Sequence, residues 1–511
     1  MHDTEKTDPG IDRSTPRVIV VLPAPLGPLM ISTSPSSVSV ARRWSFMRRL
    51  YPADRYYGMR LLFLLQPGKN SRSIFQGLIR GFADAGHHAM VLELAPFWNA
   101  YTREPARREA LMGEATRALA DLIRRERAEA TVAMWGNGIS TFAGGMASGR
   151  PSTVFDVLGV PHLLYWLDAP HWAAGGSAAS LFGHPAIAGP MLLHAVNNQG
   201  IADEMTGVLG FGRTVPIAYG VDTREFRPGP IRAEAAPFDL VVSCGPGDPP
   251  PTAIELRELE NEVPDMPAIR AERARLASES LRSLAATDAD ARVLSLLLES
   301  QLTSPHTPML ARAREIARAE PRAAQAMSAL LGDAGRWVKT TAAIRSVDQS
   351  ARAFTISWLS RRCRMAVFGA LSEAWPIVAT RAGEVAFEQM TEWYGRGLAG
   401  LNVMRWQDDV GVNLKPLEIG ASGRVCLCAR RAGIEALLDP AREVITFDTP
   451  DGALRELRAL RDSPSRAAEL GGAARARIER DHTWAARATI LARALADVRA
   501  GQAPAHQPVM G

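Results

Sequence analysis

The chain has 511 residues, which is more than one domain of ~150 residues needs, and its 47% hydrophobic and 22% charged residues are those of a globular protein. The net charge of +5 comes almost wholly from arginine, since only Lys6, Lys69, Lys339 and Lys415 are lysines. No basic cluster interleaved with aromatic residues occurs, so we do not expect nucleic acid as a partner.

The N-terminal segment lacks a folding pattern. Its most apolar run, residues 18–41, holds four prolines, which excludes a continuous membrane-spanning helix, and it follows an acidic leader unlike a signal peptide. We therefore expect residues 1–58 to be disordered, or to lie upstream of a true start near Met59, and residues 501–511 to form a disordered tail. The four cysteines lack metal-site spacing, which favours a reducing, cytoplasmic location.

From Met59 onward, short apolar runs alternate with segments of helical periodicity. The first runs are "MRLLFLLQ", "AMVLEL", "ATVAMWG" and "VPHLLYWLDAP". Such alternation predicts a doubly wound parallel sheet, and hence an N-terminal Rossmann-like lobe over residues 59–225. Ligand-facing residues are expected where strands end, in segments 66–70, 136–138 and 168–171.

A second alternating region follows the proline-rich segment "GVDTREFRPGP". It opens with "FDLVVSCG", resumes with "RMAVFGA", "GLNVMRW", "GRVCLCA" and "EVITFD", and is interrupted over about 252–339 by an almost purely helical pattern. The predicted fold class is therefore α/β, with two Rossmann-like lobes and a helical insertion in the second lobe, which spans residues 226–500.

The last ~110 residues carry four pieces in a characteristic order: "LNVMR", "NLKPLEIGASG", "GIEALLDPAREVITFDTP" and "DHTWAAR". Together they resemble the C-terminal lobe of the CgeB-like (spore maturation protein B-like) glycosyltransferases, which are related to the group 1 glycosyltransferases. The first lobe is similar more loosely, through "LGVPHLLYWLDAPHW" and "PIAYGVDTREFRP". The resemblance implies the two-lobed GT-B architecture and transfer of a sugar from a nucleotide-diphosphate-sugar donor.

The predicted donor site centres on Glu418. A carboxylate accepts both hydroxyls of a ribose, and the resemblance places Glu418 there; the alternative is a solvated helix acid. Lys415 lies on the same helix face by its i, i+3 spacing and supplies a compact positive charge for the diphosphate, unless it merely coats the surface. Arg405 is a second candidate cation, and Asn413 and Gly423 complete the site.

On the acceptor side, Asp168 and His171 follow a predicted strand within an aromatic frame. Asp168 either deprotonates an acceptor hydroxyl or positions the substrate, and its structural alternative is a turn cap before Ala-Pro. In the group 1 enzymes a further glutamate contacts the donor sugar, and that position here is Val410. We expect no metal and no cofactor, since helix dipoles and basic side chains neutralise a leaving diphosphate.

Two other classes stay open. One is a non-catalytic scaffold that keeps both lobes and uses the insertion as its interaction surface, and the other is a nucleotide-sugar epimerase, which lacks a matched motif. The acceptor is left open among protein, lipid and polysaccharide. His482 and Trp484 are interpreted as packing residues beside a terminal helix that braces the first lobe.

Overall fold

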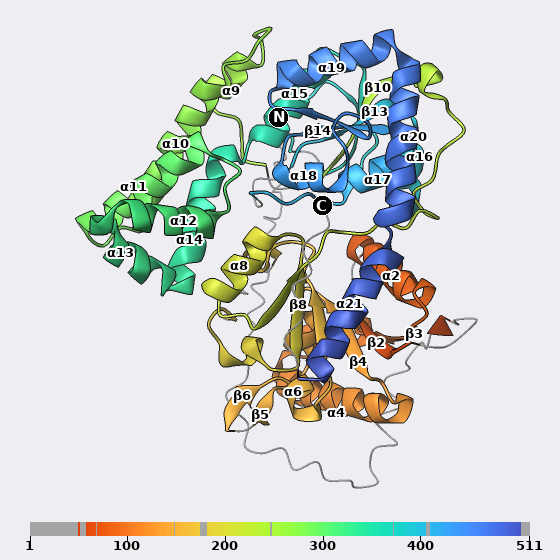
Figure 1. The fold of residues 1–511 in the computed structure, drawn as a ribbon, viewed down its shortest axis with the longest axis vertical. Coiled ribbons are helices and arrows are strands. Elements are labelled where there is room, and N and C mark those ends of the chain that lie inside the picture. Colours follow the sequence, from red (N-terminus) through yellow and green to blue (C-terminus); the bar gives the residue numbers. More distant parts are fainter. Residues whose placement is uncertain are drawn as a thin grey trace, which may run out of the picture.

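A computed structural model of the protein describes residues 50–51, 58–67, 69–147, 149–173, 181–245, 248–370, 372–404 and 409–501. It shows two α/β lobes, one above the other, with a group of helices at the side of both (Figure 1). The predicted fold class is confirmed.

The first lobe is built on a seven-stranded sheet in the order β1-β3-β2-β4-β7-β8-β9. Its strands are β1 (Leu50–Tyr51), β2 (Arg60–Leu65), β3 (His88–Glu93), β4 (Ala130–Met134), β7 (His162–Tyr165), β8 (Leu192–Val196) and β9 (Arg213–Pro216). β1 is antiparallel to β3. Residues 1–49 and 52–57, which make up most of the segment expected to be disordered, lie outside the described part. The remaining strands are parallel.

Helices cover both faces of this sheet. They are α2 (Lys69–Asp84), α3 (Ala95–Arg103), α4 (Arg108–Glu126), α5 (Asn137–Thr141), α6 (Val154–Leu158), α7 (Pro170–Ala173) and α8 (Gln199–Gly207), with a small hairpin of β5 (Gly145–Ala147) and β6 (Arg150–Ser152). In β2, Leu61 and Phe63 share a core with α2, while Leu62 and Leu64 belong to the core on the α4 side. Burial on both faces explains why the strand is continuously apolar.

The second lobe has a six-stranded, fully parallel sheet in the order β12-β11-β10-β13-β14-β15. Its strands are β10 (Phe238–Cys244), β11 (Met365–Gly369), β12 (Thr380–Arg381), β13 (Gly397–Asn402), β14 (Val425–Ala429) and β15 (Val444–Phe447), and its helices are α16 (Met390–Gly395), α17 (Lys415–Ala421), α18 (Ala432–Leu437), α19 (Pro450–Asp462) and α20 (Pro464–Asp481). Numbered along the chain, this is the 3-2-1-4-5-6 order of dinucleotide-binding folds.

The helical insertion stands between β10 and β11, as predicted. It comprises α9 (Ala253–Glu258), α10 (Met266–Arg282), α11 (Asp288–Thr303), α12 (Met309–Ala319), α13 (Pro321–Leu331) and α14 (Ala334–Arg345), and α15 (Ala351–Ser360) leads back into the sheet. Although it leaves the second lobe, its Leu310 and Trp337 share a core with Ile201 and Met205 of α8 in the first lobe. The insertion therefore bridges the two lobes (Figure 1).

The last helix, α21 (Trp484–Arg499), crosses back onto α2 and β8 of the first lobe, as expected. Trp484 is buried against glycines: a Cβ on Gly81 would lie 2.5 Å from its carbonyl carbon, and one on Gly220 would lie 2.8 Å from its Cα. The close approach of α21 thus requires glycine at both positions, which confirms the packing role of Trp484. Within the described ranges, no helix is both long and apolar enough to cross a membrane.

Candidate functional site

A cleft of about 1190 Å³ lies between the two lobes. Its walls come from the C-terminal ends of the strands in both sheets, through Trp135, Asp168 and Asn197 in the first lobe and residues 242–245 and 401–404 in the second. Ligands of open α/β sheets bind where the strand order reverses. These switch points fall between β2 and β4 and between β10 and β13, so each lobe presents its switch point at the cleft.

Lys415 and Glu418 form an ion pair beside the second switch point. Lys415 begins α17 and lines the cleft, and its Nζ lies 2.8 Å from Oε2 of Glu418. The predicted i, i+3 geometry is therefore confirmed. Glu418 is only 1% exposed, and its Oε2 also accepts a hydrogen bond of 3.2 Å from the Tyr394 hydroxyl. Burial, reinforced by Glu418, raises the pKa of Tyr394 well above its ordinary value, so this hydroxyl keeps its proton.

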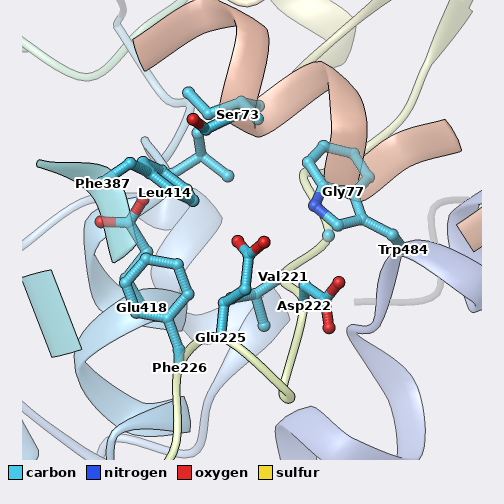
Figure 2. Close-up of a pocket in the computed structure, with 12 residues that line it drawn as sticks. Ser73, Gly77, Val221, Asp222, Glu225, Phe226, Phe387, Leu414, Glu418 and Trp484 are labelled. Atoms are coloured by element: carbon cyan, nitrogen blue, oxygen red, sulfur yellow. The ribbon is translucent and has the colours of Figure 1, made fainter. Parts of the chain in front are cut away.

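Glu418 does not line the large cleft. It borders a cavity of about 10 Å³, room for roughly one water, which Glu225 of the interlobe linker also lines (Figure 2). Leu414 lies in the wall of both the small cavity and the cleft. The Glu418 carboxylate thus sits directly behind the Lys415 ammonium, on the side away from the cleft.

The other predicted donor residues have different positions. Asn413 lines the cleft, and its Oδ1 accepts a hydrogen bond of 3.0 Å from the backbone N–H of Lys415, which fixes the start of α17. Gly423, with φ of 73°, follows the C-terminal end of that helix and faces Pro228, so it turns the chain but does not line the cleft. Arg405 lies outside the described residues.

Of the two predicted acceptor residues, Asp168 lines the cleft at the end of β7, as its strand-end position predicted. His171 does not line it. His171 is buried, and its Nε2 lies 3.2 Å from a guanidinium nitrogen of Arg345. Burial, together with the positive charge of Arg345, lowers the pKa of His171 well below its ordinary value. His171, predicted as an acceptor-side catalytic residue, thus lies beside Arg345 and outside the wall of the cleft.

Arg345 joins the insertion to both lobes, which the sequence did not indicate. Its Nε lies 3.0 Å from Asp409 of the second lobe. Its Nη2 donates to both Asp409 and Glu204 of α8. These three side chains are nearly or fully buried. Burial raises the pKa of Glu204 although Arg345 opposes the shift. Asp409, which precedes Val410, is bound by Arg345 in this cluster and does not line the cleft.

Two further cleft residues were also missed. Arg352 of α15 donates to the carbonyl of Gly245 at 2.6 Å and to Asp248 at 2.7 Å, and its Nε has no partner within the described structure. It brings a guanidinium to the wall of the cleft at the end of β10. Trp135 follows β4 with an unusual positive φ of 52°. No sequence signal marks Arg352 among the chain's many arginines.

A cleft between two Rossmann-like lobes, with a switch point on each side, defines the GT-B class of architecture. Residues 345–493, well under half of the chain, match a protein-family model described as "Glycosyl transferase-like". This segment contains α15, β11, β13 and the whole of α17 with Lys415 and Glu418. No curated protein matches the chain.

Several solved structures are similar over most of the chain. A sucrose-phosphate synthase from Thermosynechococcus elongatus is 10% identical, covers 87% of this chain and 100% of its own, and has a TM-score of 0.43. HepE of Anabaena in complex with UDP-glucose is 11% identical, with coverage of 86% and 100% and a TM-score of 0.42. A DNA-modifying beta-glucosyltransferase is 9% identical, with 86% and 99% coverage and a TM-score of 0.43. Such low values carry no information on substrate or mechanism.

Proposed function

We propose that the protein is a CgeB-like glycosyltransferase that moves a sugar, of the hexose class, from a nucleotide-diphosphate donor to an acceptor without a metal ion. One observation carries the proposal. Lys415, inside the segment matched by the glycosyl transferase-like model, lines the cleft near the switch point of a 3-2-1-4-5-6 sheet, and Asp168 of the first lobe lines the same cleft. That switch point is where such sheets bind nucleotides.

The donor would bind by an exchange of partners. Without donor, the Lys415 ammonium and the Glu418 carboxylate neutralise each other. A diphosphate in the cleft offers Lys415 a doubly charged partner, and Arg352 approaches the same strand ends. When Lys415 turns outward, the carboxylate behind it faces the cleft and accepts the ribose hydroxyls, which keeps the buried charge hydrogen-bonded.

The acceptor would bind across the cleft, beside Asp168. In the transfer, the bond from the anomeric carbon to the diphosphate oxygen breaks, a bond to the acceptor oxygen forms, and the acceptor hydroxyl loses its proton. Asp168 is the carboxylate of the first-lobe wall and either takes that proton or positions the hydroxyl. Lys415 and Arg352 would stabilise the leaving diphosphate in place of a metal ion.

The test is calorimetric titration of the full chain with UDP, GDP and ADP, followed by a donor-hydrolysis assay with the nucleotide that binds. We expect micromolar-range binding, at least tenfold weaker in Glu418→Ala, and slow hydrolysis that EDTA leaves unchanged. The 2′-deoxy form of that nucleotide should bind more weakly than the ribo form to the wild type but equally to Glu418→Ala. Glu392→Gln, an exposed acid of α16 paired with Arg396, is the matched control.

The alternative is a non-catalytic scaffold on the same fold. The position of the upstream glutamate is Val410, and its neighbour Asp409 is bound by Arg345, so no acid at either position contacts a donor sugar. Nucleotide binding without turnover of any sugar donor would favour the scaffold. If none of the three nucleotides binds, or if Glu418→Ala binds them as well as the wild type, the proposed donor site is wrong.

A further inference from the structure

Trp135 has a strained backbone at the edge of the cleft. Its φ of 52° lies in the left-handed region, which a bulky side chain rarely adopts and which costs roughly 1–3 kcal/mol. Among the described residues, the other non-glycine with positive φ is Arg127. Arg127 is the C-cap of α4, where this conformation is ordinary. Trp135 caps no helix end, so its conformation needs another reason.

The chain had a cheaper way to make this turn. Gly136 follows immediately, and glycine adopts a positive φ without steric strain. Yet Gly136 has an ordinary φ of −81°, and the positive φ falls on Trp135. Hydrogen bonds hold the strained form: the Trp135 N–H donates to the Tyr165 carbonyl at 2.9 Å, and Asn137 donates to the Met134 carbonyl at 2.8 Å. The strained backbone therefore holds Trp135 at the wall of the cleft, where it also packs against both hydrophobic clusters of the first lobe.

The ring lies at the switch point of the first sheet. β2 pairs with β4 as far as Leu64↔Ala133. Gln66 and Trp135 directly follow the ends of these two strands, and of the two it is Trp135 that lines the cleft. Gln66 is 3% exposed, and neither its amide nitrogen nor its amide oxygen has a partner within the described structure. The Trp135 Nε1 is likewise buried and unpartnered there. Buried polar atoms without partners mark a place where a ligand or ordered water belongs.

We infer that Trp135, with Asp168 and Asn197 in the same wall of the cleft, forms an acceptor subsite for a saccharide. The inference rests on the proposed function, which it deepens by naming the acceptor class. A pyranose has a face of polarised C–H groups, which suits the negative face of an indole. Its hydroxyls suit the carboxylate and amide side chains at the neighbouring strand ends.

The size of the cleft agrees with a second ligand. Its volume of about 1190 Å³ exceeds the roughly 300–1,000 Å³ of a pocket for one small molecule. A donor at the second-lobe switch point therefore leaves the first-lobe half open. A lipid acceptor would need an extended apolar wall, whereas Asp168, Asn197 and Arg72 make this half polar.

The test uses saturation-transfer NMR of the full chain with the methyl glycosides of glucose, galactose, mannose and N-acetylglucosamine, each with and without the nucleotide that binds. We expect at least one glycoside to bind the wild type, at least tenfold more weakly in Trp135→Leu and about tenfold more weakly in Asn197→Ala, since both side chains line the cleft. Trp135→Phe should retain most binding, because a ring face remains. Nucleotide affinity should change less than twofold in all three variants.

Trp98→Leu is the matched control, because Trp98 is also partly buried with an unpartnered Nε1 but does not line the cleft. If Trp135→Leu fails to fold, Asn197→Ala and Trp135→Phe still decide. Glycoside binding that survives in both Trp135→Leu and Asn197→Ala, or the binding of nucleotide but no glycoside, would overturn the subsite. Glycoside binding without any nucleotide binding would instead refute the proposed donor site and leave the subsite standing.

Discussion

Lys415 has two contacts that allow the role of its charge in nucleotide binding to be measured. It lines the cleft on one side and pairs with Glu418 on the other. We expect Lys415→Gln to weaken binding of the nucleotide diphosphate ten- to hundredfold, because a hydrogen bond to a charged group is worth about 1.5–3 kcal/mol. The free nucleoside, which lacks phosphate, should bind as before. Lys339→Gln, an exposed lysine of α14, should change neither affinity, and an equal loss for nucleoside and nucleotide would contradict the phosphate contact.

His194 gives the first lobe a pH-dependent stability. Its Nδ1 accepts from the Trp166 indole at 3.2 Å, and its Nε2 donates to the Ile187 carbonyl at 3.1 Å. Burial lowers its pKa to about 4. Below the unfolded pKa of about 6.5, the unfolded chain binds a proton that the folded chain does not. His194 should therefore contribute a fall of roughly 2–4 kcal/mol in the free energy of unfolding between pH 6.5 and 4, to which the other buried histidines His162, His171 and His482 add. Urea titrations should show a shallower fall in His194→Gln and an unchanged one in His184→Gln.

At the scale of elements, the insertion is fixed to both lobes by Arg345. Replacing it with methionine leaves Glu204 and Asp409 as buried carboxylates without their cation, which costs about 3–5 kcal/mol. We expect Arg345→Met to lower the free energy of unfolding by that amount and to expose α12 and α14 to limited proteolysis. Arg292→Met breaks an exposed pair with Glu320 in the same insertion and should cost under about 1 kcal/mol. Equal effects would show that Arg345 is no anchor.

These elements also show what a sequence can predict. Lys415 and Glu418 are three residues apart on one helix, so their pairing follows from helical geometry, and Asp168 follows from the rule that parallel strands end at one edge. Arg345 is 141 residues from Glu204 and 64 residues from Asp409 along the chain. No local sequence pattern predicts partners so far apart. The "MWG" pattern favours glycine for a positive φ, so the conformation of Trp135 was equally hidden.

At the scale of the whole molecule, the two lobes share one hydrophobic core. Phe63 of the first lobe, Val241 and Leu417 of the second, and Trp484 and Leu491 near the C-terminus belong to a single cluster. Lobes joined only by a linker would unfold separately. A core that crosses between them couples their unfolding, so we expect one transition in urea, with coincident midpoints by far-ultraviolet circular dichroism and by tryptophan fluorescence.

Gly81→Ala tests whether α21 transmits this coupling. The added methyl group would lie 2.5 Å from the carbonyl carbon of Trp484, and a backbone cannot yield as a flexible side chain does, so α21 must move off α2. We expect the free energy of unfolding to fall by about 1–3 kcal/mol. The circular dichroism and fluorescence midpoints should no longer coincide, because α21 then packs less closely on the first lobe. Gly113→Ala in α4 meets nothing closer than the Arg117 guanidinium at 3.6 Å, and should raise stability by about 0.5–1 kcal/mol. Midpoints that stay coincident in Gly81→Ala would show that the insertion, rather than α21, carries the coupling.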